Sequence, residues 1–428
     1  MFDLLVIGAG PGGYTAAARA AKLGLSTAIV EERSWGGTCL NRGCVPTKTL
    51  LHASEVYRSA ADGAAIGIHA EGLRADIPEI FAYKERISRQ LCGGVESLLK
   101  GAGVTLLRGR AVITAPGSVR VTGEDGGDYE ARRILIATGS VPVRPPIPGL
   151  ELAMTSDELL EGADHLYRSI VIIGGGVIGV EFATFYSDLG CSVTLLEGMD
   201  RLLPNMDREL GQNLALILKK QGVQVCTRSM VDRLEQTPEG IAVHYTAKET
   251  PGCAVGEAVL CAIGRRAFRD GLFAQGLTPE TNGHGLWVDE HYQTSIPGVF
   301  ACGNVVQVHD LVDFVSGESE LAGAAAANYI QNGPVATGRV LTVKPGADLG
   351  YTLPQRIRLE GVEKSTNVSF RVRRICGKST ILVKSGDTVI AHFKRDRLAP
   401  GEMEHIALPK VLLDRAPMDE VTIEIEEA

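Results

Sequence analysis

The chain has 428 residues, 45% of them hydrophobic, which is enough for two or three domains with separate cores. Its net charge of -8, without any Lys/Arg run, argues against a nucleic acid or an anionic membrane as partner. No stretch has the length and apolarity of a membrane span, and the chain enters a strand at once without a basic leader. We therefore expect a cytoplasmic protein. An odd count of nine cysteines indicates that any cystine is catalytic rather than structural.

A strand, a glycine turn, a helix and a second strand ending in acid are predicted at residues 4–32, LLVIGAGPGGYTAAARAAKLGLSTAIVEE. The same pattern returns about 166 residues later at 169–198, SIVIIGGGVIGVEFATFYSDLGCSVTLLEG. In both copies the first glycine of GxGxxG stands 23 positions before the acid, from Gly8 to Glu31 and from Gly174 to Glu197. A single GxGxxG is weak evidence, but this repetition predicts two dinucleotide-binding units.

Each glycine and acid of such a motif has a physical task. The first glycine, Gly8, permits the tight turn, and Gly10 lets the backbone approach a pyrophosphate that faces the N–H groups of the helix N-terminus. Gly13 lets the helix pack on the strand, and Glu31 reaches the position of a ribose diol. The second copy repeats these parts with Gly174, Gly176, Gly179 and Glu197. Because a carboxylate repels a 2′-phosphate, the second site is expected to prefer NAD to NADP.

Outside the two glycine motifs the sequence predicts mainly short strands and turns. Short alternating strands are predicted at 111–130, then a strand that ends in the ATGS turn at 137–140, then a Pro-rich linker. A further strand at 298–304 is expected to return to the first sheet. From about Tyr351 the sequence alternates with period two, as in VSFRVRR, STILVKS and VTIEIEE, which predicts a small all-β domain.

The segment GGTCLNRGCVPTK places Cys39 and Cys44 at the start of a predicted helix, where the helix N-terminus favours a thiolate. With this segment, roughly the first 265 residues closely resemble dihydrolipoamide dehydrogenase, a member of the pyridine nucleotide-disulfide oxidoreductases. The resemblance implies FAD on the first unit, NAD on the second, and a redox-active disulfide between Cys39 and Cys44. It implies hydride transfer between nicotinamide and flavin, and exchange of the resulting dithiol with an external disulfide.

The resemblance also implies individual roles. Cys44 is the thiol nearest the flavin, Cys39 is the interchange thiol, and Lys48 lies near the flavin and pairs with Glu181 of the second motif. A cation there would stabilise reduced flavin. Cofactor contacts beyond the two motifs fall on matching turns, namely Gly37, Thr38, Lys48, Ala137, Thr138, Gly139, Gly264 and Asn304.

Two departures from the family stand out. None of the nine histidines lies in a HPTxSE-like segment, which supplies the family's His/Glu base, and Asn304 replaces the aspartate of its GDV turn.

From about Pro297 the chain instead resembles FAD-dependent NAD dehydrogenases associated with anaerobic glycerol-3-phosphate oxidation, which pass electrons to a partner subunit. His309 is a candidate for the missing base, although a loop histidine that bonds neighbouring backbone is the simpler interpretation. A helix is expected to open at Ser316 to Glu320, with its N–H groups toward the flavin.

The predicted fold is α/β, with two Rossmann-like dinucleotide-binding domains, FAD then NAD, and a small C-terminal all-β domain. The predicted domains are 1–147 and 268–340 for FAD, 148–267 for NAD, and 341–428 for the β-rich part. The predicted function is an NAD-linked disulfide oxidoreductase of dihydrolipoamide dehydrogenase type, acting on a small-molecule or lipoyl-protein disulfide, with no metal. Two alternatives are an NADH–flavin electron-transfer subunit with a redox partner, and a non-catalytic redox-sensing module. A homodimer is left open, because the family builds its dimer with the domain that differs here.

Overall fold

The structure, a computed structural model, describes residues 1–283, 285–336 and 338–427. They form two compact units, the first made of residues 1–37, 93–140 and 267–428, and the second of 38–92 and 141–266. The chain crosses between the units at four places, within α2 (Gly37–Asn41), α4 (Ile77–Gly101), β7 (Ser140–Pro142) and β16 (Arg265–Ala267). Segment 38–92, which lies inside the first predicted domain, is thus grouped with the second glycine motif. The four predicted domain boundaries stay a prediction.

The first unit contains a mostly parallel sheet whose strands are hydrogen-bonded in the order β3-β2-β1-β6-β5-β4. The strands β1, β2, β3 and β6 are parallel, while β4 and β5 form an antiparallel extension beside β6. Strand β17 pairs in parallel with β6, so the predicted return of 298–304 to the first sheet is confirmed. Their bounds are Phe2–Ile7 (β1), Thr27–Glu31 (β2), Thr105–Arg108 (β3), Arg110–Ala115 (β4), Ser118–Thr122 (β5), Gly127–Ile136 (β6) and Val299–Ala301 (β17).

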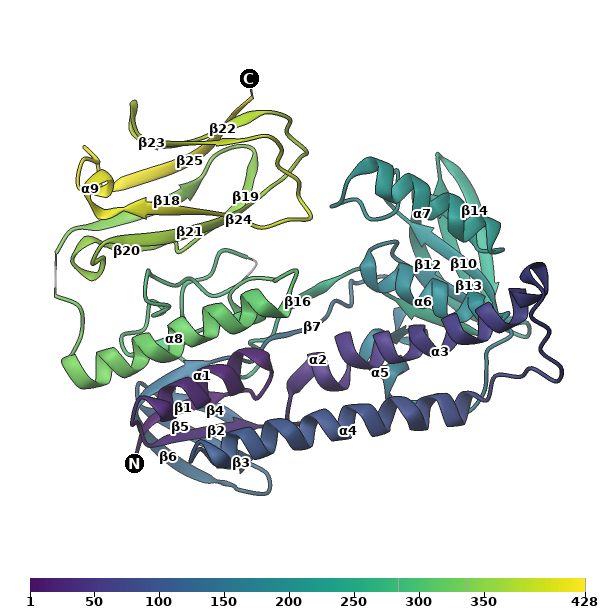
Figure 1. Ribbon diagram of the computed structural model, residues 1–428, viewed down its shortest axis with the longest axis horizontal. Helices are drawn as coiled ribbons and strands as arrows, with labels where there is room; N and C mark the ends of the chain where they lie inside the picture. Colours follow the sequence, from purple (N-terminus) through teal and green to yellow (C-terminus); the bar gives the residue numbers. More distant parts are fainter. Residues whose placement is uncertain (284, 337, 428) are drawn as a thin grey trace. The chain divides into compact units, whose positions relative to one another are not determined.

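Two helices, α1 (Pro11–Lys22) and α8 (Val312–Asn332), lie side by side in this unit, as Figure 1 shows. They approach closely because both carry small residues at the contact. A Cβ atom on Gly323 would lie only 2.6 Å from the carbonyl oxygen of Ala16. The expected helix start at Ser316 is wrong, since α8 begins at Val312 after an extended Leu311.

The second unit is built on a parallel sheet in the order β11-β10-β9-β15-β8. Apolar residues of β9, β10 and β15 are buried on both faces of this sheet. On one face they pack against helices α5 and α6, and on the other against the antiparallel β12-β13-β14 sheet. The strand bounds are Met154–Thr155 (β8), Ser169–Ile173 (β9), Ser192–Glu197 (β10), Gln224–Thr227 (β11), Ser229–Thr237 (β12), Gly240–Ala247 (β13), Thr250–Gly256 (β14) and Ala258–Cys261 (β15). The helices are Gly37–Asn41 (α2), Cys44–Asp62 (α3), Ser156–Glu161 (α5), Val177–Asp188 (α6) and Arg208–Lys220 (α7).

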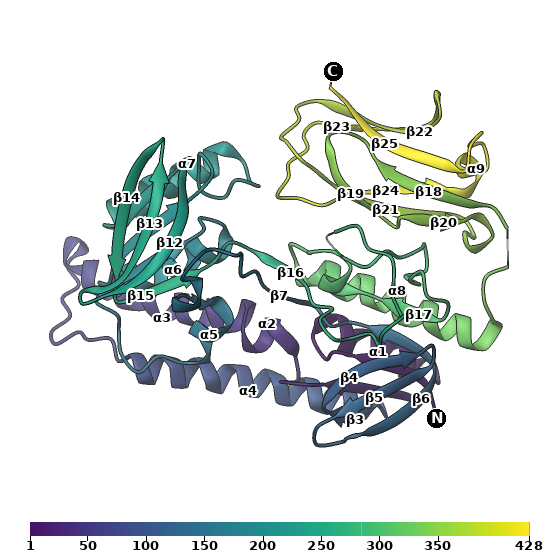
Figure 2. The same ribbon diagram turned by 180° about the vertical axis from the view of Figure 1, so that it is seen from behind.

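The C-terminal part of the first unit consists of two β-sheets and a short helix, α9 (Lys410–Leu413), seen from behind in Figure 2. One sheet has the order β20-β18-β25-β22-β23 and the other β19-β21-β24, and they share one apolar core. Alternate residues of β22 are buried, as the period-two pattern predicted. The bounds are Val340–Pro345 (β18), Leu349–Leu353 (β19), Arg356–Arg358 (β20), Ser365–Val372 (β21), Ser379–Ser385 (β22), Thr388–Arg395 (β23), Glu404–Pro409 (β24) and Glu420–Glu427 (β25).

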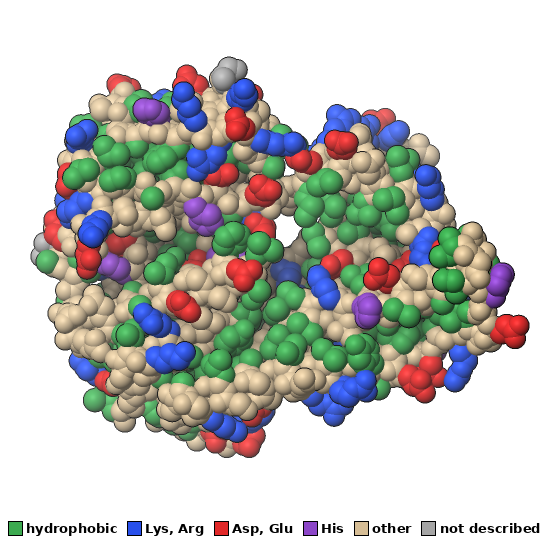
Figure 3. All heavy atoms as spheres, in the orientation of Figure 1, with side chains coloured by type: hydrophobic (Ala, Val, Ile, Leu, Met, Phe, Trp, Pro, Cys, Tyr) green, Lys and Arg blue, Asp and Glu red, His purple; other side chains and the backbone are tan. Residues whose placement is uncertain are grey.

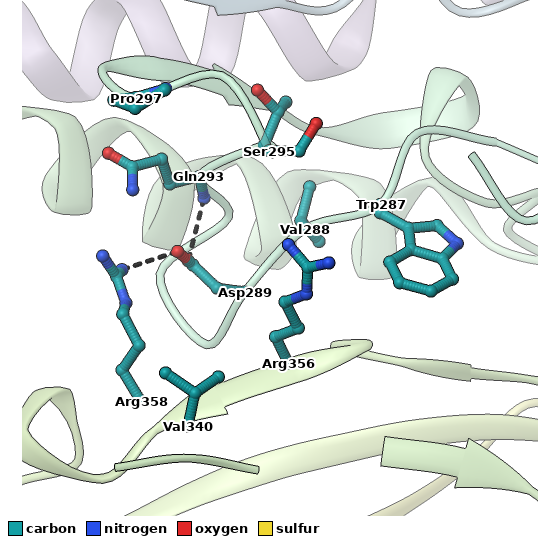
Figure 4. Close-up of a pocket in the computed structure, with 10 residues that line it drawn as sticks. Trp287, Val288, Asp289, Gln293, Ser295, Pro297, Val340, Arg356 and Arg358 are labelled. Atoms are coloured by element: carbon teal, nitrogen blue, oxygen red, sulfur yellow. Dashed lines mark hydrogen bonds and ion pairs between the residues drawn. The ribbon is translucent and has the colours of Figure 1, made fainter. Parts of the chain in front are cut away.

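A buried polar seam attaches these C-terminal sheets to the segment that precedes β17. The Gln355 side chain accepts a hydrogen bond from Val288 N (2.9 Å), and Gln355 N donates to Val288 O (3.1 Å). Beside it, Arg358 Nη2 lies 2.6 Å from the buried carboxylate of Asp289. A cavity of about 310 Å³ opens at this seam, lined by Asp289, Arg358 and Arg356 among others (Figure 4). The seam ties the C-terminal sheets to the segment before β17 by more than the connecting chain alone.

On the face shown in Figure 3, acidic and basic side chains are interspersed rather than gathered by sign. Within the described ranges, the helices all fall short of the length and apolarity that a membrane-spanning helix requires.

Candidate active site

The first glycine motif, in the first unit, is a backbone cradle that only glycine can form. Gly8 has φ +98°, and a Cβ atom there would lie 2.5 Å from Ala137 O. A Cβ atom on Gly13 would lie 1.7 Å from Gly8 O, a distance that no side chain can adopt. Gly10 caps α1 with extended backbone, so the first N–H groups of the helix have no capping side chain. These are the steric and electrostatic properties that a dinucleotide pyrophosphate needs.

The acid of the first motif is fixed by backbone groups. Glu31 Oε2 accepts a hydrogen bond from Ala9 N (2.8 Å), and Oε1 accepts hydrogen bonds from Arg33 N (2.8 Å) and Ser34 N (3.0 Å). The carboxylate is therefore held at the end of β2, beside the glycine turn. Because each carboxylate oxygen has two lone pairs, it can still accept a ribose hydroxyl.

Residues far apart in sequence complete this cradle. A Cβ atom on Gly37 would lie 2.5 Å from the Cα atom of Gly10, so the chain after β2 returns to the motif. The turn Ala137–Gly139 is anchored by Thr138 Oγ1, which donates to Phe268 O (2.6 Å), and by Gly139 O, which accepts from Phe268 N (2.9 Å). The structure thus brings together the predicted FAD contacts of the first unit.

The turn after β17, η3 (Gly303–Val305), also belongs to the cradle. Cys302 Sγ donates to Gly12 O (3.7 Å), which places the turn against the start of α1. The side chain of Asn304 accepts a hydrogen bond from His309 N (3.3 Å). Asn304 therefore orders the following loop as well as lying at the predicted flavin contact.

The second motif, in the second unit, repeats the first almost atom for atom. Gly174 has φ +108°, and a Cβ atom on it would lie 2.5 Å from Ala262 O. A Cβ atom on Gly179 would lie 1.8 Å from Gly174 O, and Gly176 caps α6 with the extended backbone that Gly10 has. Glu197 accepts hydrogen bonds from Gly175 N (2.6 Å) and Met199 N (2.7 Å), as Glu31 does in the first copy. Gly264 O accepts a hydrogen bond from Val143 N (3.0 Å) near this motif's sheet.

The cysteine pair, also in the second unit, lies where two helices meet. Thr38 and Cys39 belong to α2, whose Thr38 O accepts from Arg42 N (2.8 Å), and Cys44 is the first residue of α3. Both cysteines are free thiols here, Cys39 half-buried and Cys44 exposed. Hydrogen bonding of the Cys39 thiol to Cys44, aided by the charge of Lys48 and opposed by burial, lowers the pKa of Cys44 to about 6. The same hydrogen bond, together with burial, raises the pKa of Cys39 above its ordinary value. The geometry favours a Cys44 thiolate beside a Cys39 thiol.

Lys48 follows Cys44 by one helical turn in α3 and reaches across to α6. Its Nζ lies 2.6 Å from Glu181 Oε1, although the two residues are 133 positions apart. The structure therefore brings together all four predicted catalytic residues, Cys39, Cys44, Lys48 and Glu181, in the second unit.

His309 does not occupy an open position. Its side chain is 3% exposed, and its Nε2 lies 3.2 Å from Glu318 Oε2 of α8. Neither ring nitrogen makes a hydrogen bond of good geometry to a described residue. Such burial does not suit a base that must meet an external thiol. Glu318 went unnoticed in the sequence, where only its place in the FVSGESELAG run could have pointed to it.

Comparisons with known proteins agree with this geometry. A family model described as pyridine nucleotide-disulphide oxidoreductase matches residues 2–366. A dihydrolipoyl dehydrogenase of Geobacillus stearothermophilus is 36% identical over 334 residues, covering 76% of this chain and 70% of the relative. A dihydrolipoyl dehydrogenase of Acholeplasma laidlawii is 37% identical over 311 residues, covering 71% of this chain and 90% of the relative.

Among solved structures, the HOCl-induced flavoprotein disulfide reductase RclA from Escherichia coli has a TM-score of 0.66 at 23% identity, covering 95% of this chain and 89% of that one. This likeness concerns the fold and confirms the predicted fold class. The sequence relatives and the family model concern the chemistry as well. The chain belongs to the pyridine nucleotide-disulphide oxidoreductase family, as an oxidoreductase that uses FAD and NAD(H).

Proposed function

We propose that this chain is a dihydrolipoyl dehydrogenase-type enzyme that oxidises a dithiol, through a disulfide between Cys39 and Cys44, and forms NADH. The observation that supports it best is the unequal pair of thiols, with the pKa of Cys44 lowered to about 6 and that of Cys39 raised. Two buried structural cysteines have no reason to differ in this way. A disulfide that opens repeatedly needs one thiol that leaves readily and one that takes up a proton.

In the proposed cycle a substrate thiolate attacks Cys39 Sγ of the enzyme disulfide. The bond between Cys39 and Cys44 breaks, and Cys44 departs as a thiolate, which its lowered pKa favours. The second substrate thiol then attacks the substrate sulfur held on Cys39. The substrate disulfide forms, Cys39 leaves and takes up one proton, and the other substrate proton passes to solvent.

The remaining residues hold the groups that return the enzyme to its disulfide form. When bound, FAD accepts the electron pair of the dithiol and delivers a hydride to NAD⁺. Gly8, Gly10, Gly13 and Glu31 would hold the FAD pyrophosphate and ribose, and the corresponding residues of the second motif would hold NAD. Lys48, fixed by Glu181, supplies positive charge beside the Cys44 thiolate.

We further propose a small dithiol or a lipoyl protein as the substrate and the cytoplasm as the location. The chain spans 70% of the Geobacillus relative, and residues 367–428 lie beyond the family match. An electron-transfer partner on that C-terminal part is the second candidate function, because the family match ends at Thr366 and most of these strands follow it.

An anaerobic titration tests the proposal. The purified yellow protein is titrated with NADH and then with lipoamide, while the visible spectrum is recorded. We expect NADH to produce a long-wavelength band from the thiolate beside the flavin and lipoamide to discharge it. Direct bleaching of the flavin without that band, and without response to lipoamide, would contradict the proposal and favour the electron-transfer subunit.

A matched variant sharpens the result. Cys44→Ser should keep FAD and reduce artificial acceptors with NADH, yet lose lipoamide turnover, since an alcohol cannot form the disulfide. Cys253→Ser, which replaces an exposed cysteine of β14, serves as the control and should behave as the unmodified enzyme. Lipoamide turnover that survives Cys44→Ser would rule out the disulfide cycle.

A further inference from the structure

Within the first unit, one face of the β19-β21-β24 sheet contacts the loop that follows turn η3. In β21, the side chains of Val368, Phe370 and Val372 are buried in the apolar core of the C-terminal part. Because successive side chains of a strand point to opposite faces, Ser369 and Arg371 lie on the other face of the sheet. Figures 1 and 2 show this sheet on the α8 side of the C-terminal part. The second face is therefore turned toward the chain around α8.

From this face Arg371 bridges the C-terminal part and the loop 306–311. Its Nη2 donates to both carboxylate oxygens of Asp310, each at 2.9 Å, and to Val308 O (3.4 Å). Its Nη1 donates to Pro400 O (2.7 Å) in the loop between β23 and β24. The Arg371 side chain is only 20% exposed. The guanidinium is therefore fixed on one side by the C-terminal part and holds the loop on the other.

A second contact joins the same sheet to the first turn of α8. The ring centroids of His405 and Phe314 are 5.3 Å apart, and His405 Nδ1 lies 2.8 Å from Ser369 Oγ. Ser369 and His405 are direct register partners on β21 and β24. The sheet thus contacts the chain on both sides of Leu311, and the loop is held at two points.

The loop that Arg371 holds is hydrogen-bonded to the predicted flavin contact, Asn304. Asn304 Oδ1 accepts a hydrogen bond from His309 N (3.3 Å). His309 lies between the two residues whose oxygens Arg371 binds. The orientation of the Asn304 side chain therefore depends on where Arg371 places the backbone of His309.

The beginning of turn η3 has a separate anchor in α8. The Glu318 carboxylate accepts hydrogen bonds from Gly303 N (2.6 Å) and Gln307 Nε2 (2.9 Å). These bonds fix the backbone at the start of the turn, whereas the Asn304 side chain depends on the later part of the loop. Loss of the Arg371 contacts should therefore disturb Asn304 while the turn itself stays folded.

We propose that Arg371 is a positioning residue for FAD, through which the C-terminal sheets hold the Asn304 side chain in place for the cofactor. Arg371 acts through the loop that ends at Asp310 and not by contact with FAD. The C-terminal part thereby has a task of its own, which is to retain the cofactor. This inference rests on the FAD binding of the proposed function and makes no use of the dithiol step.

The test is the rate of FAD release from the purified holoenzyme on dilution, followed by the fluorescence of free FAD without NADH or dithiol. Arg371→Gln should release FAD about tenfold faster, which corresponds to the loss of roughly one charge-assisted hydrogen bond. Asp310→Asn should act in the same direction. Arg371→Lys should give an intermediate rate, because an ammonium can pair with Asp310 but lacks the planar fork that also binds Pro400 O.

A double variant tests the route through Asn304. Asn304→Ala should also accelerate release, and Arg371→Gln/Asn304→Ala should release FAD no faster than Asn304→Ala alone. Effects that multiply in the double variant would overturn the proposal, since Arg371 would then act independently of Asn304. Release from Asn304→Ala at the unmodified rate would overturn it as well. Failure of the disulfide cycle alone would leave all these rates as expected, so the two proposals can fail separately.

Arg374→Gln is the matched control. Arg374 follows Arg371 by three residues and pairs with Asp348 (2.8 Å) and with Glu427, all in the C-terminal part. Its loss removes an ion pair from the same sheets and should leave FAD release unchanged. Equal acceleration by Arg374→Gln and Arg371→Gln would indicate general loosening and overturn the proposal, as would an unchanged rate in Arg371→Gln. If Arg371→Gln fails to fold, Asp310→Asn decides by the same comparison.

Discussion

Lys48 Nζ of α3 lies 2.6 Å from Glu181 Oε1 of α6, which ties the helix that begins with Cys44 to the helix that starts within the second glycine motif. Lys48 is 60% exposed and Glu181 20% exposed, so the pair adds little to folding stability. Its effect is on the neighbouring thiolate, since the charge of Lys48 lowers the pKa of Cys44 and that of Glu181 raises it.

Substitutions in this group should therefore move the pKa of Cys44 in opposite directions. In the reduced enzyme, Lys48→Met should raise it from about 6, and Glu181→Gln should lower it. Cys39→Ala should raise it more than Lys48→Met, because the hydrogen bond from Cys39 is the largest cause of the shift. Thiolate ultraviolet absorbance across a pH series measures each value, with Cys44→Ser as the blank. Equal effects of Lys48→Met and Glu181→Gln, with the same sign, would contradict the electrostatic account.

The two glycine cradles allow a matched pair of steric variants. A Cβ atom on Gly13 would lie 1.7 Å from Gly8 O, and one on Gly179 would lie 1.8 Å from Gly174 O. Gly13→Ala should yield protein with little or no FAD, whereas Gly179→Ala should retain FAD and lose NADH binding at least tenfold. Flavin content and NADH titration distinguish the two. Loss of FAD from Gly179→Ala with normal FAD in Gly13→Ala would reverse the assignment of the cofactors.

The acid of the second motif should set the preference for NADH. Glu197→Gln keeps one oxygen, which can accept a hydrogen bond from Gly175 N or from Met199 N, and removes the charge that repels a 2′-phosphate. The ratio of kcat/KM for NADH over NADPH, measured with an artificial acceptor, should fall about tenfold, which corresponds to about 1.4 kcal/mol. Glu31→Gln, the corresponding change in the first motif, should leave that ratio unaltered. An unchanged ratio in Glu197→Gln would refute the role of this carboxylate.

The seam between Asp289 and Arg358 should make stability depend on pH. Burial, and then the charge of Glu290, raises the pKa of Asp289 to about 6, against an ordinary 3.8. Because the folded state prefers the protonated acid, ionisation of Asp289 destabilises the protein progressively as the pH rises from about 4 to about 6. Arg358 offsets part of this cost at 2.6 Å.

Asp289→Asn removes this cost and keeps an oxygen for the hydrogen bonds from His291 N (2.9 Å) and Gln293 N (3.0 Å). We therefore expect the Tm of Asp289→Asn minus the Tm of the unmodified protein to be larger at pH 8 than at pH 5. The exposed control Asp387→Asn, in the turn before β23, should show no such difference. A Tm difference for Asp289→Asn that is the same at both pH values would contradict the raised pKa.

Local patterns were sufficient for much of the fold. Glycines at fixed spacing before Glu31 and Glu197 predict both dinucleotide turns, because a positive φ and a close backbone approach are properties of single positions. The alternating residues of β22 predict its buried and exposed faces, because successive side chains of a strand point to opposite sides of the sheet. The start of α8 was predicted four residues too late, and this helix packs closely on a neighbouring helix, α1, at Gly323. Helix boundaries depend on such tertiary contacts as well as on the local sequence.

The roles within the site required the folded chain. The spacing of Cys39 and Cys44 indicates a redox pair, yet which of them is the thiolate follows from one hydrogen bond, from burial and from the position of Lys48. Glu318 meets Gly303 and His309 because α8 passes beneath the turn after β17, a contact that no periodicity encodes. Sequence determines which groups are available and where the backbone must bend. Only tertiary structure determines which charges are buried together, because desolvation and pairing depend on segments that are distant along the chain.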